Sequence, residues 1–95
     1  MYVVVRRYAA AQQLVTAMEQ KKADVEQLLR GVPGFRSYYA INSGGSVATI
    51  TVRDDKAGTD ESIRVAAEWV RQNVPAGAVN PPEVTEGGTY IQFNR

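Results

Sequence analysis

Hydrophobic and polar residues follow two periods along this chain, and each change of period marks a predicted element. Residues 2–8 (YVVVRRY) are β-branched and aromatic, which favours a first strand. Apolar residues then recur three, four and seven positions apart, which predicts one long helix that ends near Arg30 and Gly31. The apolar face of this helix consists of Leu14, Met18, Val25, Leu28, Leu29 and Val32.

Residues 31–55 (GVPGFRSYYAINSGGSVATITVRDD) predict a β-hairpin, because two alternating runs flank the pair Gly44 and Gly45. One face of the hairpin is the more apolar, and it carries Phe35, Ser37, Tyr39, Ile41, Ala48, Ile50 and Val52. The other face is mixed, and it carries Arg36, Tyr38, Ala40, Asn42, Val47, Thr49, Thr51 and Arg53.

A polar loop then leads into a second helix, which Thr59 or Asp60 can cap and which Pro75 ends. Its apolar stripe is Ile63, Ala66, Ala67, Val70 and Val74. The last strand is predicted in the segment TYIQFN, near residues 88–94, with a bend at Gly87 and Gly88.

The predicted order β-α-β-β-α-β is that of a ferredoxin-like α+β fold, with a four-stranded antiparallel sheet and both helices on one face. Ninety-five residues suit a single domain, residues 1–95. We expect the helices to cover the more apolar face of the hairpin. The mixed face is then a candidate for the contact between two sheets of a homodimer that close into a barrel, and a plain solvated sheet is the alternative.

The composition argues against some classes of function. The formal net charge of +1 is small for a protein that binds nucleic acid, and no apolar run is long enough to span a membrane. The chain has no cysteine, so a reducing cytoplasm is its simplest location. It also has no histidine, the commonest general base and transition-metal ligand, so we expect neither a metal site nor a cofactor.

Two segments resemble a known family. VPGFRSYY, residues 32–39, resembles the PGF…Y signature of the dimeric α/β-barrel superfamily of antibiotic biosynthesis monooxygenase-like domains. Residues 54–75 (DDKAGTDESIRVAAEWVRQNVP) are similar to a stretch common in small bacterial members. The resemblance implies a dimer. The superfamily contains cofactor-independent monooxygenases, haem-degrading enzymes, isomerases, decarboxylases and members without a known reaction.

Few of the functional residues known in this superfamily have a match in this chain. Haem-degrading members have a tryptophan on the second helix, which Trp69 matches. They have an asparagine near the end of the first strand, where Arg7 stands instead, and their haem-ligating histidine has no counterpart. The resemblance therefore does not imply haem degradation by the usual route of the family.

The predicted site lies between the helices and the more apolar face of the sheet. Within it, Arg7 orients an oxyanion or quinone oxygen, Tyr39 shares a proton and Trp69 stacks on a ring. The expected catalytic residues are Arg7 and Tyr39, and the expected ligand-binding residues are Val5, Ile50 and Trp69. The structural alternative is that Trp69 only seals a contact between helices or subunits.

Two functions compete. The first is a cofactor-independent monooxygenase acting on a small aromatic or quinol substrate, which can itself supply electrons to oxygen if the protein orients and desolvates it. The second is a non-catalytic dimeric module that binds a small ligand or serves a structural role. A cavity lined by Trp69 and tyrosine with a polar group favours the first, and a cavity filled by side chains favours the second.

Overall fold

A computed structural model describes all residues from Met1 to Arg95. Its elements are β1 (Tyr2–Tyr8), α1 (Gln12–Gln20), α2 (Lys22–Arg30), β2 (Phe35–Ser43), β3 (Ser46–Arg53), α3 (Lys56–Asn73) and β4 (Glu83–Gly88). None of these helices has the length and apolarity that crossing a membrane requires.

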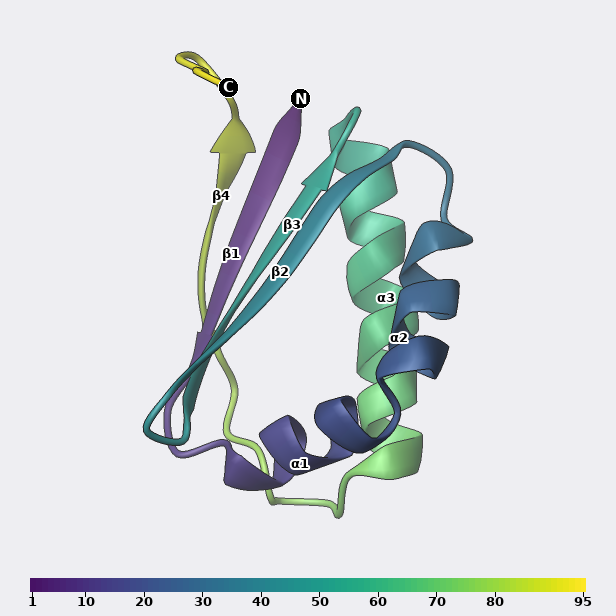
Figure 1. Cartoon of the computed structure of the whole chain (residues 1–95), viewed down its shortest axis with the longest axis vertical. Helices are drawn as coiled ribbons and strands as arrows, with labels where there is room; N and C mark the ends of the chain where they lie inside the picture. The colour runs from purple at the N-terminus through teal and green to yellow at the C-terminus, as the bar shows by residue number, and fades with distance from the viewer.

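The four strands form one antiparallel sheet in the order β2-β3-β1-β4, and all three helices cover the same face of it (Figure 1). The turn between β2 and β3 is the predicted one. Gly44 and Gly45 both have positive φ, at 60° and 92°, and Asn42 Oδ1 accepts a hydrogen bond from Gly45 N at 3.0 Å. The predicted ferredoxin-like α+β fold is confirmed.

The single long helix predicted after β1 is in fact two helices. The break falls at Lys21, whose φ of −118° and ψ of 33° are not helical. Lys21 Nζ donates a hydrogen bond of 2.5 Å to Asn73 Oδ1 at the end of α3. The break lets α2 run alongside α3 while α1 lies across the end of the sheet (Figure 1).

The prediction of which sheet face the helices cover is wrong. The residues buried beneath the helices belong to the mixed face: Val4, Val47, Thr49, Thr51 and Arg53. The more apolar face is the open one, and Tyr39 and Ile41 on it are 56% and 50% exposed. The polar groups on the covered face are tolerated because Arg53 has backbone partners and because others line a cavity, described below.

Arg53 ties the end of α2 to the sheet. Its side chain is fully buried, and its guanidinium donates to the carbonyl oxygens of Leu29 at 2.5 Å and Val32 at 2.9 Å. The ring of Phe35 covers the guanidinium at 4.8 Å. A cation at these carbonyls complements the negative end of the α2 dipole, which explains how a charge is accommodated in the core.

The predicted position of the last strand is also wrong. β4 is Glu83–Gly88 and pairs with β1 from Arg7↔Glu83 to Tyr2↔Gly88. Because β1 begins at Tyr2, an antiparallel neighbour that continues past Gly88 has almost nothing left to pair with. The segment predicted as the strand extends beyond the sheet, and Tyr90 and Phe93 in it are 92% and 91% exposed.

Candidate functional site

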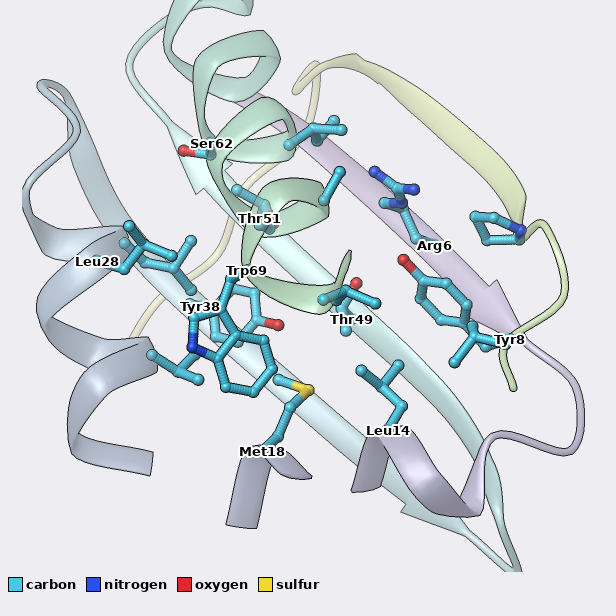
Figure 2. Close-up of a pocket in the computed structure, with 18 of the residues that line it drawn as sticks. Arg6, Tyr8, Leu14, Met18, Leu28, Tyr38, Thr49, Thr51, Ser62 and Trp69 are labelled. Atoms are coloured by element: carbon cyan, nitrogen blue, oxygen red, sulfur yellow. The ribbon is translucent and has the colours of Figure 1, made fainter. Parts of the chain in front are cut away.

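A cavity of about 300 Å³ lies between the helices and the covered face of the sheet (Figure 2). Thirteen of its 20 lining residues are hydrophobic. The lining as a whole comes from every helix and from β1, β2, β3 and the segment before β4. Its volume is at the lower end of the range for small-molecule pockets, and its mainly apolar lining is typical of them.

Trp69 forms one wall of the cavity. It projects from α3 toward Met18 of α1 and Tyr38 of β2 (Figure 2). Ala66 and Ala67, which precede it on α3, also line the cavity, and their small side chains leave volume next to the indole. An indole beside open space and a thioether forms a surface on which a flat aromatic molecule can stack.

The sheet supplies the polar end of the cavity. Arg6 and Tyr8 project from β1 into the same space as Tyr38 and Thr49 (Figure 2). The Arg6 guanidinium lies 5.7 Å from the centroid of the Tyr8 ring, and Arg6 Nε is buried without a hydrogen-bond partner. A polar atom that is buried without a partner within the protein is a place where a ligand can bind.

Ser62 supplies a second buried atom of this kind. Ser62 lines the same cavity from α3, and its buried Oγ has no hydrogen-bond partner. Ser62 is 1% exposed, and Thr51 on β3 is another hydroxyl of the lining. The cavity therefore combines an aromatic and aliphatic wall with two lining residues, Arg6 and Ser62, that each have a buried polar atom without a partner.

Tyr38 is held in its neutral form. Burial raises the pKa of its phenol to about 12, with a smaller contribution from the neighbouring Tyr8. The positive charge of Arg6 and a hydrogen bond with Thr49 act in the opposite direction without cancelling this effect. At neutral pH the Tyr38 hydroxyl is therefore a hydrogen-bond donor rather than a base.

A groove of about 460 Å³ adjoins the cavity and shares Met18, Val25, Leu29 and Tyr38 with it. The outer lining of this groove is charged, with Glu19, Lys22, Glu26 and Arg30. Tyr38 thus belongs to the lining of both the inner cavity and the charged outer groove.

The structure separates most of the predicted site residues from the cavity. Only Trp69 lines it. Val5 and Ile50 face each other across β1 and β3, and Tyr39 lies opposite Ile50 on β2, all on the open face. Arg7 follows Val5 by two residues and shares that face. The prediction that these side chains share a pocket with Trp69 is wrong, because the helices cover the other face of the sheet.

Arg6, Tyr8 and Tyr38 are the cavity residues that the sequence interpretation missed. A signal for them exists in the sequence. The mixed face is neither as charged as a solvated sheet nor as apolar as a sealed core, which suggests a subunit contact. A face of that character also suits a partly polar cavity under helices. No group of three or more Asp or Glu side chains in the structure could hold a metal ion.

No model of a protein family matches the sequence, and no curated protein matches it. Several solved structures are similar to the structure of this chain. The chain is similar to the haem-degrading protein MhuD from Mycobacterium tuberculosis, with 9% identity, coverage of 99% and 100% of the two chains, and a TM-score of 0.67. It is similar to the monooxygenase ActVA-Orf6 of Streptomyces coelicolor, solved with nanaomycin D, with 16% identity, coverage of 99% and 91%, and a TM-score of 0.69.

It is also similar to SnoaB, a cofactor-independent oxygenase from Streptomyces nogalater, with 14% identity, coverage of 99% and 97%, and a TM-score of 0.66. These likenesses span nearly the whole chain. They confirm the fold that the resemblance in sequence implied, because the chain shares its ferredoxin-like fold with these three proteins.

Proposed function

We propose that this protein is a cofactor-independent monooxygenase that oxidises a small aromatic molecule of the quinol type. The observation that carries the proposal is the cavity beside Trp69, which the tyrosines and Arg6 also line and which side chains do not fill. Among the proteins of this fold, ActVA-Orf6 is a monooxygenase and SnoaB a cofactor-independent oxygenase, which supports the same chemistry here.

The reaction needs no electron donor other than the substrate. A quinol and one O₂ give a hydroxyquinone and one water, so the ring supplies all four electrons and receives one oxygen atom. The protein then has to exclude water, hold the ring and stabilise an electron-rich form of it. Trp69 holds the ring by stacking, and the neutral Tyr38 donates a hydrogen bond to a ring oxygen.

The test measures O₂ uptake and product with 1,4-naphthohydroquinone and with anthrone under ¹⁸O₂. Monooxygenation places one labelled atom in the organic product and releases the other as water. Spontaneous oxidation of the quinol instead gives an unlabelled quinone and hydrogen peroxide. Protein-dependent label in the product supports the proposal, and the unlabelled quinone alone, at the rate without protein, overturns it. A ligand bound without uptake favours the non-catalytic binding module.

We also propose that the active form is a homodimer that associates through the open sheet face. This face carries Val3, Val5, Tyr39, Ile41, Ile50 and Val52. Contiguous apolar patches of this kind mark association sites on soluble proteins. The mixed face, which the sequence suggested as the interface, is unavailable, because Thr49 and Thr51 are 7% and 6% exposed beneath the helices of the same chain.

A further inference from the structure

Arg6 is the charged residue of the cavity lining, and it has no counterion. The other lining side chains are apolar or neutral. None of the ion pairs in the structure includes Arg6. Glu86 lies on the helix-facing side of β4, but it accepts a hydrogen bond of 2.7 Å from the Tyr2 hydroxyl and lies 4.0 Å from Lys56 Nζ.

The contacts of Arg6 within the protein are weak for a guanidinium. The Tyr8 ring at 5.7 Å offers a cation–π contact, and Arg6 Nε is buried without an acceptor. Tyr38 stays neutral, since burial raises its pKa to about 12, and so supplies no negative charge. The cavity therefore carries one uncompensated positive charge in an apolar surrounding, where an opposite charge is bound more strongly than in water.

We propose that Arg6 is the anion-binding group of this cavity and that its ligand is a flat aromatic molecule carrying one negatively charged oxygen group. The guanidinium binds the oxyanion, and the aromatic and aliphatic wall around Trp69 and Met18 binds the ring. The proposal rests on the proposed function only for the location of the site. It adds the charge of the ligand and the residue that selects it.

This role would also serve the oxidation. A phenol next to a fixed guanidinium ionises more readily, because the opposite charge favours the phenolate. The phenolate is the more electron-rich form of the ring. An arenecarboxylate would bind Arg6 through the same charge without being activated in this way, so a carboxylate probe measures recognition separately from chemistry.

The test is a calorimetric comparison of two probes of the same shape, 1-naphthoate and the uncharged 1-naphthamide, at neutral pH. Wild type should bind naphthoate at least about tenfold more tightly, as a charge-assisted hydrogen bond in a partly buried site allows. Arg6→Gln should abolish this preference, and Arg6→Lys should keep part of it because the charge remains. The matched control is Arg64→Gln, because this arginine of α3 is exposed and lies outside both cavity linings.

Each outcome decides the proposal. A preference for naphthoate that survives Arg64→Gln and disappears in Arg6→Gln supports it. Equal binding of the two probes, or a preference that Arg6→Gln leaves in place, overturns it while the monooxygenase proposal stands on its own oxygen assay. Absence of binding by either probe overturns it as well. If Arg6→Gln does not fold, Arg6→Lys decides the proposal. A reduced preference for naphthoate in Arg6→Lys counts for it, and an unchanged preference counts against it.

Discussion

Val5 and Ile50 lie directly opposite each other on β1 and β3, and no helix covers them. Their sequence neighbours Val4 and Thr49 point the other way and are 0% and 7% exposed beneath the helices. Adjacent positions on the same strands therefore serve different purposes. One set packs against the helices of its own chain, and the other set is available to a second copy.

This relationship predicts different outcomes for lysine at two neighbouring positions. Ile50→Lys should give a folded protein with a weakened dimer, since the twofold symmetry of a dimer places two unpaired charges in one interface. Thr49→Lys should instead destabilise the monomer, because the charge would enter the space beneath the helices. Light scattering measures the first effect, and far-UV circular dichroism with thermal melting measures the second.

A surface control completes this pair. Gln72→Lys, on an exposed position of α3, should change neither mass nor melting. If Ile50→Lys keeps the mass of a dimer at micromolar concentration, or wild type is itself a monomer there, the open face is not the dimer interface.

The sequence was sufficient for the order of the elements and insufficient for the faces. Alternation shows which residues share a strand face, and it grouped Tyr39 with Ile50 correctly. It does not show which face the helices cover, because a sheet face that joins subunits can be as apolar as a core. Because Thr49 and Arg6 are polar, their face does not look in the sequence like the one that helices cover. A cavity on the covered face accommodates both side chains.

The position of β4 shows the second limit. The segment TYIQFN has a far stronger strand propensity than EVTEGG, yet the latter is β4. The register of pairing with β1 determines the position of β4. Glu83 lies opposite Arg7, and Gly88 already lies opposite Tyr2 at the start of β1. Such pairing depends on where the chain returns after α3, which local preference does not encode. The break of the first helix falls at Lys21, whose hydrogen-bond partner is the distant Asn73 at the end of α3, so this contact too is not encoded locally.

The buried guanidinium of Arg53 should be important for stability. Arg53→Ala removes hydrogen bonds to the carbonyls of Leu29 and Val32, which should lower the free energy of unfolding by about 3 kcal/mol or more. Arg53→Lys should cost less, since one ammonium keeps the charge but lacks the planar fork that spans both carbonyls. Urea unfolding measures both.

Arg36 is the matched control for this prediction. It forms a 2.6 Å ion pair with Asp54, and both side chains are more than half exposed. Arg36→Ala should therefore change the free energy of unfolding by less than about 1 kcal/mol. Equal losses in the two alanine variants would mean that the contacts of Arg53 with the end of α2 do not stabilise the fold.

Tyr38 should be visible in an alkaline titration. Burial raises its pKa from 10.0 to about 12, so between these values the folded protein keeps a proton that the unfolded chain releases. The stability that this proton provides is present below pH 10 and is lost as the pH rises toward 12. The pKa of Tyr2 is also raised, chiefly by its hydrogen bond to Glu86, so the measurement is best made in a Tyr2→Phe background.

In that background, tyrosinate absorbance should show a late phase near pH 12 that Tyr38→Phe removes. Tyr39→Phe, at a position 56% exposed on the opposite face, is the control and should leave the late phase in place. A late phase that persists in Tyr38→Phe would show that this phenol is not held neutral by burial in the cavity.

Trp69 should contribute to the affinity for the ligand and not to the stability of the fold. Trp69→Phe keeps an aromatic ring but reduces the stacking surface, so we expect 1-naphthoate to bind roughly three- to tenfold more weakly, in line with about 0.5–1.5 kcal/mol for an aromatic pair. Val65→Ala, one helical turn earlier on α3 and outside the cavity lining, is the matched control. Calorimetry should find naphthoate binding unchanged in Val65→Ala. Oxygen uptake with 1,4-naphthohydroquinone should likewise fall in Trp69→Phe and stay unchanged in Val65→Ala. If the two variants weaken binding equally, Trp69 only seals the contact between helices, and the cavity beside it is not where the ring binds.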